Sequence, residues 1–327
     1  MKKHVPLYTL VLVFAVIIIS PIAVVSSPQP AVHHTVAIRT DGSLWGWGIN
    51  SQGQLGEGDG ANTLIFYPMQ IGTDRDWKTV AAGSEHTVAI KTDGSLWAWG
   101  ANNEGQVGNG TTNTRVRVPT QIGSDTDWVD VSAGEFHTMG IRVDGSLWAW
   151  GSNQFGQLGT GSSCRRRHTP TQIGSDTDWH SVPTGVNNTV SVKSDGSLWG
   201  WGVNFYGSSV GYTSRIAPIQ FGADSNWAIA ATSGLNIGYH SVAVKTDGSV
   251  WTWGSSLNRP GSEAQRYPTQ IVFMREEDQQ ELRQALVQEV NRAYANETIY
   301  KVLALVFILG LIVVVLFKIK KRSQIKK

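Results

Sequence analysis

Four histidines occupy one position of a repeated sequence phrase, and imidazoles in such a set could hold a metal ion. They are His34, His86, His137 and His240, with Asn188 in the remaining copy. A metal needs its ligands about 2 Å away, whereas equivalent positions in repeats of this length lie far apart. We therefore expect a structural hydrogen bond that is repeated at each histidine.

Pairs of acidic residues precede a tryptophan in three copies, and carboxylates at this spacing could bind calcium. The pairs are Asp74/Asp76, Asp125/Asp127 and Asp176/Asp178. No third acidic ligand follows at the spacing of a calcium loop, and Asp in a Gly- and Ser-rich turn commonly caps its own backbone. We favour the capping interpretation.

The other elements of catalytic chemistry are missing from the sequence. It contains no nucleophile elbow, zinc-protease pair or phosphate-binding loop. Cys164 stands beside Arg165, Arg166 and Arg167, whose charges would lower the pKa of a nearby thiol, but we favour a solvated basic loop. As the only cysteine, Cys164 has no partner for an internal disulfide. We expect no enzyme activity, no cofactor and no metal site.

The repeated phrase is Asp-Gly-Ser-Leu-Trp-x-Trp-Gly, and it defines five copies. They begin at Asp41, Asp93, Asp144, Asp195 and, with Val in place of Leu, Asp247, at spacings of 52, 51, 51 and 52 residues. A period near fifty with Gly and Trp at fixed positions is typical of a β-propeller. The sequence predicts an all-β fold, a five-repeat β-propeller of four-stranded blades.

Alternation within a copy predicts how the blades pack. Asp93-Gly94 between two apolar runs indicates a tight hairpin. Because strand side chains alternate, Trp97 and Trp99 share one face, while Leu96 and Ala98 share the other. The large residues of one blade can then pack against the small-residue face of its neighbour. This pattern accounts for all 14 tryptophans.

Ring closure is incomplete in the sequence pattern. The first copy starts at its second strand, at His34, and the last copy ends at Ile271. Either the first blade has three strands, or the segment before His34 or after Ile271 supplies the missing one. An uncovered edge strand is an aggregation hazard, so we expect some covering.

Four short motifs follow one another in the copies: Trp-x-x-Val-x-Ala-Gly, His-Thr, the Asp-Gly-Ser phrase and Gly-Gln-Leu-Gly-x-Gly. This combination resembles the regulator of chromosome condensation repeat family. The resemblance implies four-stranded propeller blades, and it suggests guanine-nucleotide exchange on a small GTPase as an alternative function. The Gly-Gln-Leu-Gly segment is altered in the fourth and fifth copies, and no exchange-specific residue can be matched.

Both ends of the chain carry long apolar runs. Met-Lys-Lys-His precedes the run 7–25, and Lys318 opens a basic tail after the run 299–317. Nineteen residues span about 28 Å as a helix, enough for a bilayer core. Basic flanks stay in the cytoplasm, which predicts a single-pass cell-membrane protein with its propeller outside. It becomes two-pass if the N-terminal segment is retained rather than cleaved as a signal.

These observations divide the chain into five parts. We predict a signal peptide or anchor at 1–30, the propeller at 31–274, a helical stalk at 275–298, a transmembrane helix at 299–317 and a basic tail at 318–327. The propeller part carries 15 basic and 19 acidic residues. This balance argues against nucleic-acid binding, which depends on basic residues.

The long loops between the third and fourth strands are the expected binding surface. They gather arginines on one rim of the propeller, whereas the Asp-rich turns lie on the other rim. The binding residues that we predict are Arg115, Arg117, Arg165, Arg166, Arg167 and Arg215. We expect a monomeric scaffold without chemistry of its own that binds an acidic or neutral protein or glycan; the remaining alternative is an extracytoplasmic enzyme such as a lyase.

Overall fold

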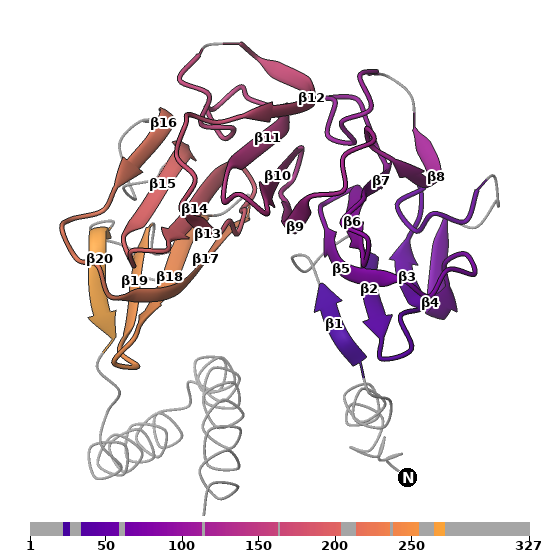
Figure 1. Cartoon of the computed structure of the whole chain (residues 1–327), viewed down its shortest axis with the longest axis horizontal. Helices are drawn as coiled ribbons and strands as arrows, with labels where there is room; N and C mark the ends of the chain where they lie inside the picture. Colours follow the sequence, from indigo (N-terminus) through magenta and orange to yellow (C-terminus); the bar gives the residue numbers. More distant parts are fainter. Residues whose placement is uncertain are drawn as a thin grey trace, which may run out of the picture. The chain divides into compact units, whose positions relative to one another are not determined.

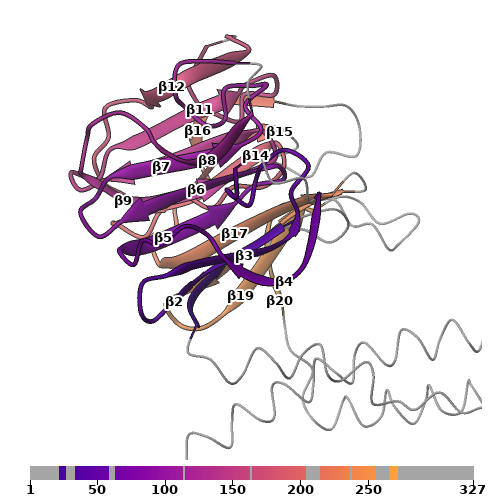
Figure 2. The ribbon, with the colours of Figure 1, turned by 90° about the vertical axis from the view of Figure 1, so that its right-hand side faces the viewer.

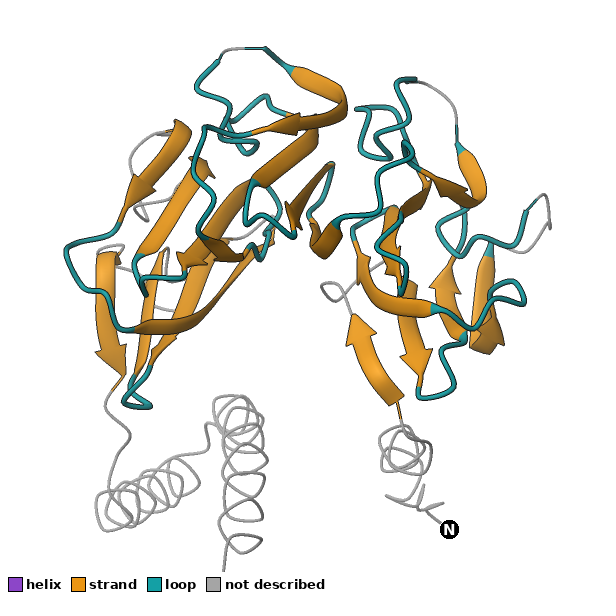
Figure 3. Cartoon of the chain, viewed as in Figure 1, coloured by secondary structure: helices purple, strands orange, loops and turns teal. Residues whose placement is uncertain are grey.

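The structure is a computed structural model that describes residues 22–26, 34–58, 63–112, 115–162, 164–203, 214–235, 238–254 and 265–271. Within these ranges the regular secondary structure consists of β-strands, joined by turns and loops (Figure 3). Twenty strands form five antiparallel sheets of four, in chain order (Figure 1). The predicted all-β repeat fold of four-stranded blades is confirmed. The predicted stalk and C-terminal transmembrane helix lie outside the described residues.

Each blade takes four consecutive strands. The first blade contains β1 (Ile22–Ser26), β2 (His34–Arg39), β3 (Leu44–Ile49) and β4 (Leu64–Gln70). The second contains β5 (Trp77–Ala82), β6 (His86–Lys91), β7 (Leu96–Gly100) and β8 (Val116–Gln121). The third contains β9 (Trp128–Ala133), β10 (His137–Arg142), β11 (Leu147–Ser152) and β12 (Arg166–Gln172). The fourth contains β13 (Trp179–Ser181), β14 (Asn188–Lys193), β15 (Leu198–Val203) and β16 (Ser214–Gln220), and the fifth β17 (Trp227–Leu235), β18 (Gly238–Lys245), β19 (Val250–Gly254) and β20 (Gln265–Ile271).

The twentieth strand comes from the segment before His34. Residues Ile22–Ser26 form β1, which pairs antiparallel with β2 through Val25 opposite Ala37 and Ser26 opposite Val36. The first blade is therefore four-stranded, although its first strand lacks the Trp-x-x-Val phrase of the other copies. β1 falls inside the segment 1–30 that we predicted as a signal peptide or anchor.

The Asp-Gly hairpins form as predicted and lie against the turns that join consecutive blades. Gly94 has a φ of +83°, which favours glycine, and a Cβ there would stand 2.1 Å from the carbonyl oxygen of Thr126. The amide of Trp128 also donates to the carbonyl of Gly94, at 3.2 Å. Both kinds of turn therefore share one edge of the molecule, which we call the turn rim; the connections between third and fourth strands form the opposite, long-loop rim.

Consecutive blades pack the tryptophan face of one against the aliphatic face of the one before it. Val88, Ile90 and Leu96 of the second blade are fully buried against Trp128 and Trp150 of the third. The same arrangement joins the first blade to the second, the third to the fourth and the fourth to the fifth. Figure 2 shows the strands β5, β6 and β7 side by side within one such sheet. The predicted division of each blade into two faces is confirmed.

The repeated histidine makes a hydrogen bond across each of three junctions. The Nε2 atom of His34 lies 2.7 Å from Oγ1 of Thr87, and that of His86 lies 2.9 Å from Oγ1 of Thr138. His137 lies farther from Thr189, at 3.4 Å. The structural hydrogen bond expected for this position is confirmed at these three histidines, and in each case the partner belongs to the following blade.

The described residues contain no helix that is both long enough and sufficiently apolar to cross a bilayer. Of the N-terminal apolar run, residues 22–25 are described, as part of β1. The C-terminal run lies outside the described residues.

Candidate binding surface on the long-loop rim

The long loops of the first three blades are built on one internal hydrogen-bond pattern. In the first blade, Asn50 Oδ1 accepts from the amide of Leu55 at 3.0 Å, and the side chain of Gln54 accepts from the amide of Gln52 at 2.8 Å. The carbonyl of Gln54 then accepts from Thr87 at 2.7 Å and from the indole of Trp99 at 2.9 Å. The loop is thus fixed both to itself and to the next blade.

The asparagine, glutamine and threonine contacts recur at Asn102 and Gln106 and at Asn153 and Gln157. The indole contact recurs at Gln157, whose carbonyl accepts from Trp201 at 2.9 Å. The repeated Gly-Gln-Leu-Gly phrase marked these loops in the sequence, but the part played by the asparagine was missed. Its recurrence four residues before the glutamine is the signal that would have revealed it.

The six predicted arginines lie on the outer strands or immediately before them. Arg115 and Arg165 precede β8 and β12, and both are exposed, whereas Arg117, Arg166, Arg167 and Arg215 lie within β8, β12 and β16. The fourth strand of the second blade, β8, begins at Val116 and therefore includes Arg117. Four of the six arginines are therefore positioned by strand backbone and not by a loop.

Arg166 and Arg167 are already engaged within the protein. Arg166 is half-buried; it donates to the carbonyl of Asn103 at 3.1 Å, and its Nε lies 3.6 Å from Glu104 in the preceding blade. Arg167 lies 3.4 Å from the hydroxyl of Ser162. These two side chains connect neighbouring parts of the scaffold, which leaves them less available to a partner than a loop position would be.

Arg165 lines a cavity of about 290 Å³ between the third and fourth blades. The remaining walls are polar at Asn153, Gln154, Ser162 and Ser214, and apolar at Phe155 and Ile216. Asn153 is buried and donates to the carbonyls of Ser162 and Cys164, which holds the loop around the cavity. Within the described residues the Arg165 guanidinium forms no ion pair or side-chain hydrogen bond. The structure brings Arg165 and the strand that carries Arg215 to the same place.

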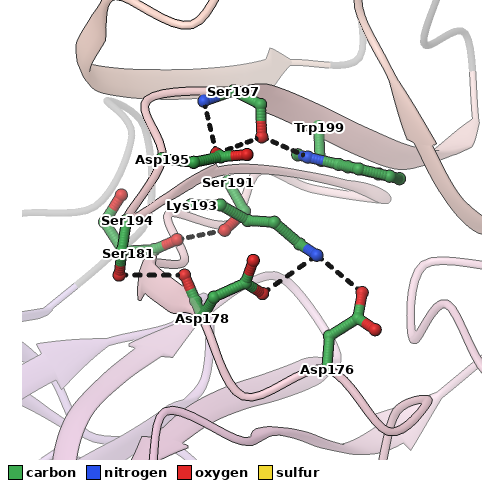
Figure 4. Close-up of polar contacts among 9 residues, drawn as sticks. All are labelled: Asp176, Asp178, Ser181, Ser191, Lys193, Ser194, Asp195, Ser197 and Trp199. Atoms are coloured by element: carbon green, nitrogen blue, oxygen red, sulfur yellow. Dashed lines mark hydrogen bonds and ion pairs between the residues drawn. The ribbon is translucent and has the colours of Figure 1, made fainter.

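The turn rim has a different arrangement, a repeated cation cage. In the fourth blade, Lys193 Nζ lies 2.6 Å from Asp176 and 2.9 Å from Asp178 (Figure 4). The same ammonium lies 4.7 Å from the ring centres of both Trp179 and Trp199. Desolvation lowers the pKa of Lys193, but the hydrogen bonds to the two carboxylates outweigh it and leave the pKa raised.

Cages of this kind recur around Lys91, Arg142 and Lys245. The capping interpretation of the paired aspartates is therefore wrong, because their carboxylates bind the cation of the same blade. The residue that does cap its own turn is the Asp of the Asp-Gly phrase: Asp195 accepts from the amide and hydroxyl of Ser197, and Ser197 accepts from the indole of Trp199. A basic residue two positions before each Asp-Gly was the available sequence signal for the cage.

These serine hydrogen bonds lower the pKa of the turn aspartates. The side chain and then the backbone amide of Ser43 hold the pKa of Asp41 at about 2, and the equivalent serines act in the same direction on Asp93, Asp144, Asp195 and Asp247. Among the described residues no three His, Cys, Asp or Glu side chains gather as metal ligands would. Cys164 is free and exposed.

Comparison with known proteins identifies the repeat. The family model described as the RCC1-like domain matches residues 25–293. The Arabidopsis thaliana protein Ultraviolet-B receptor UVR8 is 31% identical over 233 residues, which cover 69% of this chain and 52% of the receptor. The human protein named Probable E3 ubiquitin-protein ligase HERC6 is 28% identical over 252 residues, 74% of this chain and 24% of the ligase. The chain thus spans about half of one relative and about a quarter of the other.

Solved structures show the same fold at low sequence identity. Human WBSCR16 superposes with a TM-score of 0.66 at 18% identity, over 77% of this chain and 67% of that protein. Yeast RCC1 (Prp20), from its complex with Kap60, gives a TM-score of 0.59 at 18% identity, over 79% of this chain and 76% of the yeast chain. On its repeats, its blade architecture and its matched length, the chain belongs to the RCC1-like domain family.

Proposed function

We propose that the protein is a binding scaffold whose long-loop rim holds an acidic segment of a partner protein. The observation that carries this proposal is the cavity at Arg165. One cationic group with amides, hydroxyls and two apolar walls suits a carboxylate side chain with its aliphatic stem. The matched segment covers only 24% of the length of HERC6, so the repeat is one part of a larger protein there. This use of the repeat as a part of a larger protein supports a scaffold.

The distribution of charge favours an acidic partner at this rim. On the turn rim, the side chains of Lys91, Lys193 and Lys245 are largely buried in their cages, and the carboxylates they hold remain about half exposed. On the long-loop rim, Arg115 and Arg165 are exposed. An acidic segment is therefore attracted to the long-loop rim and repelled by the exposed carboxylates of the other.

The location of the scaffold is part of the proposal. The apolar runs 7–25 and 299–317 with their basic flanks support a membrane-anchored protein whose blades lie outside the cytoplasm. Adding protease to intact cells is the direct measurement. Digestion of the blades is the expected result, and blades that are degraded only after lysis would contradict the location.

Peptide selection tests the binding proposal before any natural partner is identified. A displayed random peptide library should yield Asp- and Glu-rich sequences on the wild-type protein. Arg165→Glu should slow their association roughly tenfold and remove its dependence on salt. Lys78→Glu is the matched control, because Lys78 is an exposed cation on β5. Peptides that bind both variants equally would contradict the proposed site.

A further inference from the structure

Every junction between blades joins two different surfaces. The aliphatic face of one blade, for example Val88, Ile90 and Leu96, packs on the tryptophan face of the next, with Trp128 and Trp150. Four junctions use this pairing. The two outermost blades therefore each retain one face of a pair: the tryptophan face of the first blade and the aliphatic face of the fifth.

The tryptophan face of the first blade is incompletely covered. Trp47 is half-buried, whereas the tryptophans at the same repeat position are buried: Trp99, Trp150, Trp201 and Trp253. Thr35, which pairs with Trp47 across β2 and β3, is also half-buried. At three junctions the equivalent threonine binds the histidine of the preceding blade and donates to a loop carbonyl, but no hydrogen bond of the Thr35 hydroxyl forms within the described residues.

The outer strand of the first blade, β4, also lacks a hydrogen bond that its equivalents make within the described residues. In the following blades, a glycine amide from the preceding long loop donates to this strand, as Gly58 does to the carbonyl of Arg117 at 2.9 Å and Gly110 to that of His168 at 2.9 Å. Phe66 occupies the equivalent position of β4, two residues before the shared proline. Phe66 is 82% exposed, and Tyr67 is 70% exposed.

The aliphatic face of the fifth blade is the complementary surface. Val242, Val244 and Val250 are half-buried, although the residues at these positions are fully buried in the second blade. Ile271 is 38% exposed, against 4% for the equivalent Ile122. Within the described residues, the two end faces therefore leave each other incompletely covered.

We propose that a second copy of the chain docks head to tail, with the aliphatic face of its fifth blade on the tryptophan face of the first blade. The chemistry that recognises the partner is the same one used at the four internal junctions: aliphatic side chains against indoles, with the Thr35 hydroxyl and the β4 backbone ready to bond. Such a contact is heterologous, because each copy contributes a different face. This proposed association differs from the monomer expected from the sequence. It does not depend on the proposed binding function.

Two variants, one for each face, test the proposal on the purified full-length chain in mild detergent. Light scattering across a concentration series should show association of the wild type. Thr35→Arg obstructs the tryptophan face and Val244→Asp charges the aliphatic face, so each variant alone should remain monomeric. A mixture of the two should form a dimer, because the intact aliphatic face of one copy meets the intact tryptophan face of the other.

Control variants separate docking from folding. Val143→Asp changes a residue that is 73% exposed in a turn, and it should associate as the wild type does. If Val244→Asp lowers the thermal stability, Ile271→Asp tests the same face at a more exposed position. A wild type that is monomeric throughout, or a mixture of variants that stays monomeric while the wild type associates, would overturn the head-to-tail contact.

Discussion

At the scale of single residues, the turn rim is held by cations that are sheltered from water. The Lys193 side chain is 8% exposed between two indoles and two carboxylates, and Arg142 occupies the same place in the third blade at 17%. Taking a charge out of water is costly unless partners surround it. The cage provides both carboxylates and ring faces, which explains why a charged residue stands beside the tryptophan core.

Lys193→Ala should lower the free energy of unfolding by about 2 kcal/mol, because it removes the contacts with both rings and leaves two carboxylates without their cation. Lys193→Arg should stay within about 0.5 kcal/mol, since arginine fills the equivalent cage of the third blade. Denaturant unfolding of the two variants is the measurement. Equal losses in the free energy of unfolding for Lys193→Ala and Lys193→Arg would contradict a stabilising role of the positive charge.

The buried histidines make stability depend on pH. Burial lowers the pKa of His86 and of His137 to about 3, from an ordinary 6.5, so both rings are neutral in the folded protein. Their contribution to the free energy of unfolding is complete above about pH 6.5. It is lost as the pH falls towards 3, because the histidines of the unfolded chain take up protons before those of the folded protein. Unfolding should therefore become easier between pH 6.5 and 5.

Asparagine is the natural control for this effect. Asn188 stands at the same repeat position and donates to Thr232 at 2.8 Å. The double variant His86→Asn/His137→Asn removes both titratable rings and should show a smaller loss of stability between pH 6.5 and 5. A wild type and a variant with parallel pH profiles would contradict the assignment to these rings.

At the scale of elements, β1 connects the N-terminal segment to the fold. It pairs with β2, which would otherwise present an unpaired strand edge. The same residues lie in the segment expected to be a signal peptide or an anchor. The fate of the first 26 residues therefore decides whether the first blade has three strands or four.

Introducing proline at both Val24 and Val25 tests this strand. Successive amides of a strand point in opposite directions, so at least one substitution removes a donor that faces β2. The double variant should lower stability by about 2 to 3 kcal/mol in the full-length chain. N-terminal sequencing accompanies the melts, because cleavage after Ser26 or Ser27 would remove β1 and make the substitutions silent.

At the scale of the whole molecule, stability is unevenly distributed along the row of blades. The second, third and fourth blades are packed on both faces, whereas each outer blade is packed on one. In repeat proteins stability is approximately a sum over blades and their junctions. The outer blades should therefore open more readily than the central ones.

Hydrogen exchange measured by mass spectrometry resolves these differences strand by strand. Amides of β10 in the third blade should exchange most slowly, and those of β2 and β19 in the outer blades fastest among the central strands of each sheet. Raising the protein concentration should slow exchange in β2 and β19 if a second copy covers them. Uniform protection across the five blades would contradict this gradient.

The sequence alone determined the fold class, the five repeats and the two-faced blades. Asp-Gly turns, alternating Leu-Trp-x-Trp and a fixed period act locally, so their consequences can be worked out one copy at a time. It also predicted Arg165 as a binding residue on the long-loop rim, where the structure places it beside a cavity. These features do not depend on contacts between residues that are distant in the sequence.

Only the tertiary structure decided what those residues touch. The aspartate pairs bind a cation that is 17 residues later in sequence for Lys91 and Lys193, and Arg166 reaches Asn103 in another blade. The sequence left open whether the segment before His34 supplies the missing strand, because its residues carry no repeat phrase and read equally well as a membrane segment. Pairing partners and burial depend on how blades meet, and a pattern that repeats within one copy does not contain the contacts between copies.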